Sequence, residues 1–456
     1  MAACLAVAGC GGASTTSLTS SSTSVSTRST STTPAPPAGA WTMYHRDPSH
    51  TGDDPSEPPF TSLTRAWATP PLDGAIFAEP LVLGSRVFTA TENDTVYALD
   101  AVTGAVAWTK HLAIPVPKSK FPGCGDIVPL GITSTPVIDV ATSTILVVAF
   151  EDPGGDAPGR YHLVGLDVAS GNARFDRDIT PATMDTSVHQ QRAALALSGG
   201  VVYVAWGGLN GDCGAYHGWI VGSRADGSGP AVLYEYQVPS SARSGMWAPS
   251  GPVVDSAGSV YMTTGNAASS SACDTGNTVY RWSPSLAVAD SWAPSDCIEL
   301  NRADADLGSA GPVLVDSGRL FQAGKQNTGY LLSTAALGNS PVTVDIGCSS
   351  FGGDAVNGSL VVVPCNEGLV GVNTSSTPSV AWRATTKDFY GAPIVAGGVI
   401  WAIGVDKGIL YGFATDTGAV IASAPLGGSH HFVTPSTAGG RLFASTDNGI
   451  VAFSGI

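Results

Sequence analysis

The 456-residue sequence has few charged side chains, 12% of the total, and 36 Asp and Glu residues outnumber 21 Lys and Arg residues. The resulting formal charge of −15 argues against a nucleic-acid partner, because phosphate binding depends on clustered basic residues that release counterions. After the amino terminus, no apolar run reaches the roughly 18 residues that a helix needs to cross a bilayer. These shortages argue against a nucleic-acid-binding protein and against a helical membrane protein.

Several catalytic motifs are also missing. The sequence has no Gly-x-Ser-x-Gly nucleophile elbow and no Gly-rich phosphate loop, which removes hydrolases and kinases of those types. It has no Cys-x-x-Cys pair, and none of its cysteines is accompanied by a His pair at zinc-finger spacing, so we predict no metal site. His430 and His431 are adjacent, and neighbouring side chains on a strand point apart, so we do not expect them to chelate one ion.

Glycine and proline are abundant, with 56 and 31 residues, and Val, Thr, Ser and aromatic residues are spread evenly among them. This composition predicts short strands joined by many turns. One pattern recurs: a small residue or proline, an apolar run, a glycine-containing turn and a second apolar run. Its eight copies begin at residues 80, 136, 194, 252, 312, 354, 393 and 435.

The copies are 39 to 60 residues apart, a spacing that fits four short strands and their turns. We therefore predict an all-β, eight-bladed β-propeller of four-stranded antiparallel blades over residues 41–456. The last copy has no fourth strand before Ile456, and the stretch Leu63–Thr69 can supply it. Closure by this N-terminal strand would remove the open sheet edges.

A second motif follows the third strand in several copies, and its best version is Leu99-Asp100-x-x-Thr103-Gly104-x-x-x-Trp108. It predicts a tight turn and an aromatic side chain that packs between neighbouring blades. The motif resembles the repeat of the pyrroloquinoline-quinone (PQQ)-like propellers, a family that includes quinoprotein dehydrogenases and an outer-membrane assembly lipoprotein. The segment that begins at Trp41 also resembles the start of such propellers.

The amino-terminal sequence predicts the cellular location of the protein. Val7-Ala8-Gly9-Cys10 resembles a bacterial lipobox, and residues 11–40 are almost wholly Ser, Thr, Ala, Gly and Pro. We expect residues 1–10 to be an export signal, Cys10 to carry lipid and residues 11–40 to be a disordered tether. The protein would then be extracytoplasmic and touch the bacterial membrane only through its lipid. The alternative is an ordinary apolar amino terminus followed by a disordered tail.

Six cysteines fall within the propeller, and on the blade map all of them lie in loops on one face. An even number of cysteines in an exported chain favours disulfides over zinc. Proximity predicts Cys273–Cys297 and Cys348–Cys365, which leaves Cys124–Cys213 between adjacent blades.

The candidate binding residues lie on the same face. Tyr216, His217 and Trp219 could line a small-molecule pocket, and the alternative is that they only pack. Asp304-x-Asp306 followed by Lys325 resembles the Asp-x-Asp and downstream basic residue of quinoprotein dehydrogenases. That resemblance implies a carboxylate that takes a substrate proton and a cation that holds the quinone. Loop capping and solvation are the alternative reading of the two aspartates.

The sequence lacks other features of those enzymes: a vicinal Cys-Cys pair, a Cys-x-x-Cys-His haem motif and a Glu, Asn and Asp set for calcium. We therefore predict a non-catalytic, monomeric propeller that has no cofactor. We expect it to bind an envelope protein or a glycan. The alternative is a PQQ-dependent alcohol or sugar dehydrogenase that uses the quinone with calcium.

Overall fold

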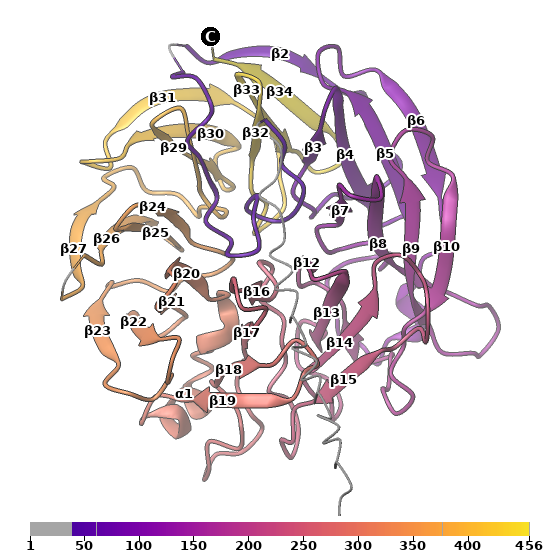
Figure 1. Cartoon of the computed structure of the whole chain (residues 1–456), viewed down its shortest axis with the longest axis vertical. Coiled ribbons are helices and arrows are strands. Elements are labelled where there is room, and N and C mark those ends of the chain that lie inside the picture. Colours follow the sequence, from indigo (N-terminus) through magenta and orange to yellow (C-terminus); the bar gives the residue numbers. More distant parts are fainter. Residues whose placement is uncertain (1–38, 61, 376, 456) are drawn as a thin grey trace, which may run out of the picture. The chain divides into compact units, whose positions relative to one another are not determined.

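The computed structural model describes residues 39–60, 62–375 and 377–455, which belong to a compact unit that runs from Thr32 to Ile456. The lipobox with Cys10 and all but two residues of the proposed tether lie outside the described residues. Within this unit, eight sheets surround a central axis (Figure 1). The predicted eight-bladed β-propeller is confirmed.

Each of the first four blades has four antiparallel strands, ordered from the axis outward. Blade 1 contains β3 (Leu81–Leu83), β4 (Arg86–Thr91), β5 (Thr95–Asp100) and β6 (Val106–His111). Blade 2 contains β7 (Val137–Asp139), β8 (Thr144–Glu151), β9 (Arg160–Asp167) and β10 (Ala173–Asp178). Blade 3 contains β12 (Ala196–Ser198), β13 (Val201–Gly208), β14 (Trp219–Arg224) and β15 (Tyr234–Gln237), and β11 (His189–Gln190) also pairs with β13. Blade 4 contains β16 (Val253–Val254), β17 (Val260–Thr263), β18 (Val279–Trp282) and β19 (Val288–Trp292).

The second half repeats the plan. Blade 5 contains β20 (Val313–Asp316), β21 (Arg319–Gln322), β22 (Thr328–Ser333) and β23 (Val342–Asp345). Blade 6 contains β24 (Ala355–Asn357), β25 (Leu360–Cys365), β26 (Gly368–Asn373) and β27 (Ser379–Arg383). Blade 7 contains β28 (Ile394–Ala396), β29 (Val399–Gly404), β30 (Ile409–Ala414) and β31 (Val420–Pro425). Blade 8 contains β32 (Ser436–Ala438), β33 (Arg441–Ser445) and β34 (Ile450–Ser454).

The ring is closed by the amino-terminal part of the chain. Strand β2 (Thr64–Ala68) pairs antiparallel with β34 and becomes the outermost strand of blade 8. The register places Thr64 opposite Ser454 and Ala68 opposite Val451. The predicted closure by Leu63–Thr69 is therefore confirmed. Three short helices occur in the described residues, the 3₁₀ helices η1 (Lys118–Lys120) and η2 (Leu307–Ser309) and the α-helix α1 (Cys297–Ala303).

The Asp-x-x-Thr-Gly turn joins neighbouring blades. Trp67 in the outer strand of blade 8 lies on Gly104 in blade 1, where an added Cβ would come within 2.5 Å of the indole. The indole Nε1 of Trp67 donates to the carbonyl of Ala101 at 3.2 Å. Trp108 lies in the same way on Gly171 of blade 2. Glycine is required at these turns for two reasons: the left-handed backbone, with φ +73 at Gly104, and the ring above it.

Residues 41–57, which we call the strap, run round the axis against the innermost strands. In Figure 1 they form the indigo coil at the centre of the ring. Part of the strap is β1 (Asp53–Asp54), which pairs parallel with β28. The Glu57 carboxylate accepts the N–H groups of Gly439 and Gly440, both at 2.7 Å. Strap carbonyls accept the N–H groups of Val82, Ile138, Val254, Leu314, Val356 and Val395 at 2.7 to 3.2 Å.

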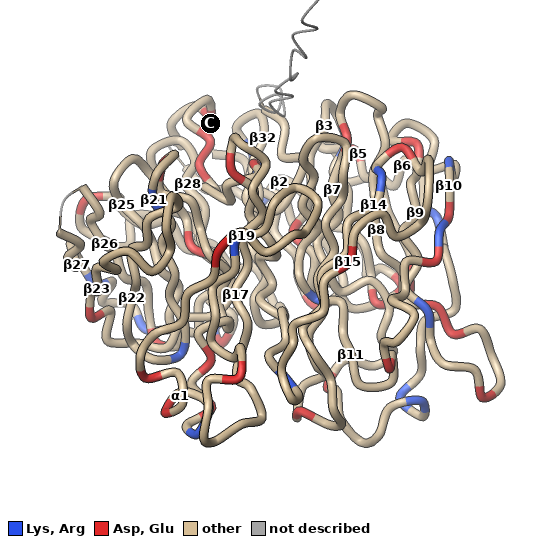
Figure 2. Tube along the Cα trace, turned by 60° about the horizontal axis from the view of Figure 1, so that its bottom comes forward, with Lys and Arg blue, Asp and Glu red and all other residues tan. Residues whose placement is uncertain are grey.

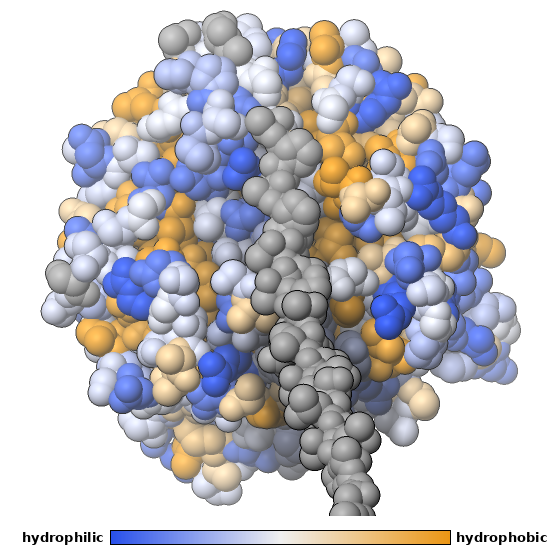
Figure 3. Space-filling model, in the orientation of Figure 1, coloured by the Kyte–Doolittle hydropathy of each residue, from blue (hydrophilic) through white to orange (hydrophobic). Residues whose placement is uncertain are grey.

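The apolar core lies between and within the sheets and includes fully buried tryptophans such as Trp206, Trp282 and Trp401. Figure 3 shows that on one face of the ring the apolar residues lie in separate groups between hydrophilic ones. Among the described residues, no helix has the length and apolar character required to span a bilayer.

Candidate functional site

A cavity of about 950 Å³ opens on one end of the ring. It is lined by loops between successive blades and by loops that join the second and third strands, so it lies round the axis. Figure 2 shows acidic and basic residues interspersed along the loops at the α1 end. The charged residues that line the cavity are Asp126, Arg192, Asp212, Arg243, Arg302, Asp304, Asp306 and Lys325. The aromatic and imidazole side chains are Phe77, Tyr216, Trp247, Phe351, His430, His431 and Phe432.

Three disulfides brace these loops. The structure joins Cys273 to Cys297 and Cys348 to Cys365, the pairs predicted from proximity, and Cys124 to Cys213, the pair that then remained. All six cysteines lie in or beside inter-blade loops and loops between second and third strands, which emerge on the cavity end. The covalent links hold the longest loops of the chain in place around the cavity.

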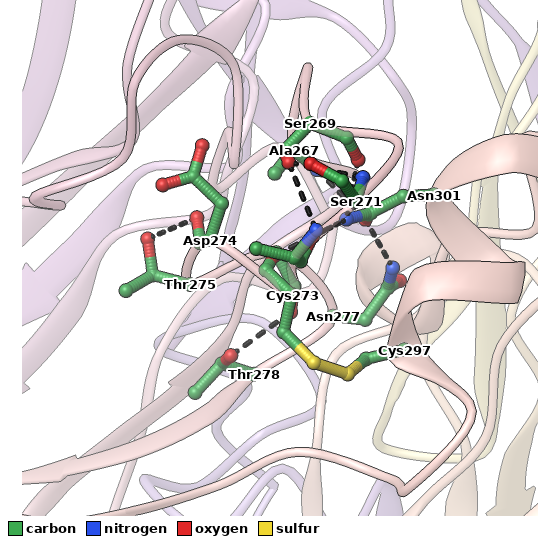
Figure 4. The surroundings of a disulfide bond; sticks show 12 residues. Ala267, Ser269, Ser271, Cys273, Asp274, Thr275, Asn277, Thr278, Cys297 and Asn301 are labelled. Atoms are coloured by element: carbon green, nitrogen blue, oxygen red, sulfur yellow. Dashed lines mark hydrogen bonds between the residues drawn. A yellow bond between two sulfur atoms is a disulfide. The ribbon is translucent and has the colours of Figure 1, made fainter.

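The bond between Cys273 and Cys297 fixes α1 against the loop that follows β17 (Figure 4). Asn301 on α1 continues this attachment: its Oδ1 accepts from the N–H of Ala267 at 3.0 Å, and its Nδ2 donates to the Cys273 carbonyl at 3.2 Å. Asn277 also donates its Nδ2 to Asn301 Oδ1 at 2.9 Å. This network orients the residues on both sides of it, which include two that reach the cavity, Asn266 and Asp304.

Asp304, Asp306 and Lys325 come together in the cavity wall. Lys325 Nζ lies 2.5 Å from Asp306 Oδ2 and 3.4 Å from Asp304 Oδ2. Asp304 ends α1 with a left-handed backbone, φ 53, while Asp306 is buried and accepts the N–H of Asn266 at 2.6 Å. Gly265 permits this approach, because a Cβ there would lie 2.6 Å from Asp306 Oδ1.

Burial and charge oppose each other in this cluster. Burial raises the pKa of Asp306, and Lys325 limits the rise. Partial burial works to lower the pKa of Lys325, but the carboxylates of Asp306 and Asp304 outweigh it and raise that pKa. Trp247 lies on the same wall, with the Lys325 ammonium 5.8 Å from its ring centroid. The wall thus presents a compensated ion pair beside an indole.

The structure does not bring the other predicted pocket residues together, and only one of them lines the cavity. Tyr216 lines the cavity, and its hydroxyl donates to Asp212 at 2.6 Å, while Asp212 also pairs with Arg243 at 3.2 Å. His217 does not line the cavity, and its Nδ1 lies 3.2 Å from Ser240 Oγ. Trp219 is buried in the apolar core on β14.

Arg192 and three further ring side chains form another part of the cavity wall. The Arg192 guanidinium lies over Phe432, with Cζ 4.4 Å from the ring centroid. Burial lowers the pKa of Arg192 to about 10, so it remains charged at neutral pH. Phe432 holds a left-handed backbone, φ 72, which is unfavourable for a bulky residue. Phe351 and His431 lie near it, with His431 5.8 Å away between ring centroids.

The cavity does not fit the calcium ion that the quinone alternative requires. No group of three or more His, Cys, Asp or Glu residues in the described part of the chain could hold a metal. Lys325 already pairs with Asp306 at 2.5 Å and also lies 3.4 Å from the exposed Asp304. The Asn266 amide is occupied on both sides, since its Nδ2 donates to Asp304 and its Oδ1 accepts from Asn277. The oxygen atoms that could have held a calcium ion therefore already bond to other groups of the chain.

Comparison with known proteins places the chain in a family. A family model described as "Outer membrane protein assembly factor BamB" matches residues 64–307, more than half of the chain. The chain belongs to this family. No curated protein sequence matches this PQQ-like propeller.

Solved structures share the fold. A quinohemoprotein alcohol dehydrogenase from Comamonas testosteroni aligns with a TM-score of 0.70 and 14% identity over 92% of this chain and 81% of its own. BamB from Moraxella catarrhalis aligns with a TM-score of 0.60 and 18% identity over 86% of this chain and 99% of its own. A europium-containing methanol dehydrogenase aligns with a TM-score of 0.66 and 15% identity over 90% of both chains. Because the identities are this low, the alignments show that the PQQ-like propeller has the same fold as these proteins and nothing further.

Several cavity residues escaped the sequence analysis, among them Arg192, Trp247, Asn266 and Phe432. None belongs to a recognisable motif. One signal was available, because Arg192 and Phe432 lie two to three residues before an inner hairpin begins, where the chain enters a blade from the cavity end.

Proposed function

We propose that this chain is an extracytoplasmic, lipid-anchored propeller that binds a small polar ligand in its axial cavity and does not transform it. The observation that carries the proposal is the state of the cavity's charged groups. Lys325 is engaged by Asp306, and Arg243 by Asp212, so the acid–base groups compensate one another, whereas Arg192 forms no ion pair. A pocket of about 950 Å³ with convergent polar groups is the kind of space that small molecules occupy.

Location and partners belong to the same proposal. Three disulfides in one chain are typical of an oxidising compartment outside the cytoplasm. The family description, an outer membrane protein assembly factor, supports an envelope protein as a further partner, and a glycan remains the other candidate. Mass spectrometry of the mature amino terminus tests the anchor. An unmodified peptide that runs through Cys10 would refute it.

The ligand itself is tested by occlusion of the cavity. The full chain is incubated with envelope extract, washed and denatured, and released small molecules are identified by mass spectrometry. Ala75→Trp places an indole at the cavity wall, whereas Val102→Trp adds the same bulk at an outer turn, where the wild-type valine is 57% exposed. We expect retention by the wild type and by Val102→Trp, and loss in Ala75→Trp. Equal retention by all three proteins, or by none, would overturn the proposal.

A quinone-dependent dehydrogenase is the second candidate, favoured by one observation: Trp247, Asp306 and Lys325 share a single wall of the cavity. An indole offers a flat apolar surface, and a buried carboxylate with raised pKa can accept a proton. The test adds PQQ with calcium or a lanthanide and follows cofactor absorbance and dye-linked oxidation of alcohols and sugars. Stoichiometric uptake with turnover that Asp306→Asn abolishes would establish this function in place of the first.

A further inference from the structure

Arg192 differs from the other cations of the cavity. Among the described residues its guanidinium has no hydrogen-bond or ion-pair partner, and it lies over the Phe432 ring. Lys325 and Arg243 each have a carboxylate partner, and the exposed Arg302 donates its Nε to the Ser270 carbonyl at 2.7 Å. The charges of Glu92 and Asp126 act on Arg192 from a distance without pairing with it. Its N–H donors are thus available to a ligand.

The surroundings of Arg192 add further donors. A recess of about 10 Å³, lined in part by Arg192, Tyr44 and Phe432, shares lining residues with the cavity. A volume of this size holds about one water molecule. Tyr44 is 2% exposed, and its hydroxyl has no hydrogen-bond partner. The buried Gln190 Nε2, another donor on the cavity wall, also has none.

A charged guanidinium that loses water without gaining a partner is unfavourable, and an anion would offset that loss. A planar guanidinium matches carboxylate and phosphate oxygens in a two-pronged arrangement. The Tyr44 hydroxyl can support the same anion through a water in the recess. Phe351 and Phe432, with ring centroids 5.8 Å apart, give an apolar surface next to this position.

We propose that Arg192 binds the anionic group of the cavity's ligand, a carboxylate or a phosphate carried on an apolar body that packs against Phe351 and Phe432. The inference rests on the proposed function, since it names the chemical class of the molecule that occupies the axial cavity. Lys325 takes no part in this recognition, because the two aspartates already neutralise it.

The test uses 4-fluorobenzoate as the probe and fluorine NMR line broadening of the full chain. 4-Fluorobenzamide is the neutral control of the same shape, and competition by inorganic phosphate separates phosphate recognition from carboxylate recognition. We expect the benzoate to bind and Arg192→Gln to weaken it on the order of 10- to 100-fold. Arg65→Gln, with the same charge change on the exposed outer strand β2, should bind like the wild type.

The outcomes separate this inference from the function on which it rests. Equal benzoate affinity in the wild type and Arg192→Gln, or equal affinity for the benzamide, would overturn it. So would the absence of benzoate and phosphate binding at about 10 mM. A neutral molecule retained by the wild type and lost in Ala75→Trp would then leave the proposed function standing. If Arg192→Gln fails to fold, Arg192→Lys keeps the charge without the fork, and we expect intermediate binding.

Discussion

The ammonium group of Lys325 lies 2.5 Å from Oδ2 of Asp306, and this contact forms a largely buried ion pair at the cavity wall. The two side chains are 21% and 8% exposed, whereas Asp304, the second carboxylate, is 75% exposed. Asp306 therefore depends on Lys325 for charge compensation, and Asp304 depends on water. An internal cation in this place makes a bound metal unnecessary for the stability of the carboxylates.

Lys325→Met should destabilise the fold by about 1–3 kcal/mol, because it leaves Asp306 buried without a partner; the partial exposure of Lys325 keeps the figure below that of a fully buried pair. Without Lys325, burial raises the pKa of Asp306 further above its unfolded value. The deficit should therefore be smallest near pH 4 and grow toward neutral pH, because Asp306 ionises in the folded wild type at a lower pH than in the folded variant. Urea unfolding at several pH values measures it.

The matched control for that variant is Lys387→Met. Lys387 pairs with Glu367 at 3.0 Å, but the two side chains are 77% and 68% exposed, and such surface pairs contribute little. The double variant Lys325→Met/Asp306→Asn should recover most of the lost stability. A deficit of Lys325→Met that does not change with pH would contradict the assigned role of Lys325.

Removal of Lys325 should also create a cation site. With Lys325→Met, the carboxylates of Asp304 and Asp306 lose their ammonium partner and become available oxygen ligands for hard cations. We expect Tb³⁺ to bind the variant roughly tenfold or more tightly than the wild type. Trp247, on the same wall, should sensitise the terbium luminescence. Equal luminescence from the wild type would show that a metal competes successfully with Lys325.

The contact between Trp67 and Gly104 gives a test of ring closure. Gly104→Ala places a Cβ 2.5 Å from the indole and forces it off the turn, which should destabilise the protein by about 2–4 kcal/mol. Gly84→Ala is the control, since Gly84 has a similar left-handed backbone, φ +60, but nothing within 4 Å of the new Cβ. That variant should cost only about 1 kcal/mol of backbone strain. Thermal unfolding compares them, and equal losses would rule out a role for the indole contact.

The fold could be predicted because its information repeats along the chain. Every inner hairpin has two apolar runs, and all but the one that begins at Pro136 join them through a glycine turn, so eight weak local signals support one another. The closure by β2 followed from the same count, since the last blade was one strand short. The strap could not be derived in this way, because residues 41–57 bond to the blades mainly through backbone carbonyls, which leave no side-chain pattern.

The cavity could be predicted only in part. Asp304, Asp306 and Lys325 stand close together in sequence and meet in space, as a resemblance to a known motif suggested. Arg192 and Phe432 are 240 positions apart, and their contact depends on how the ring closes. Trp219 was a pocket candidate because it follows loop residues in sequence. In the structure it begins strand β14 and points into the core.

His50 in the strap is the chain's clearest source of acid sensitivity. The residue is 2% exposed, neither ring nitrogen has a hydrogen-bond partner, and the Tyr44 ring lies 5.4 Å away in an edge arrangement. Burial, followed by the nearby His45, lowers the pKa of His50 to about 3. Glu79 and Asp354 lie in the same region, and burial raises the pKa of each. Their ionisation therefore lowers the stability of the fold as the pH rises, whereas protonation of His50 lowers it as the pH falls.

His50→Asn isolates the histidine, because asparagine tolerates the left-handed backbone found here, φ 59, and does not titrate. The folded pKa lies below the unfolded value of 6.5, so the unfolded chain binds the extra proton as the pH falls from 6.5 toward 3. Relative to the variant, the wild type should lose about 2–3 kcal/mol of stability between pH 7 and pH 4.5. The carboxyl groups are common to both proteins and cancel in the difference. Urea unfolding across this range measures it, with His111→Asn, at an exposed histidine, as the control. Parallel pH profiles for the wild type and His50→Asn would mean that the strap opens to water around His50.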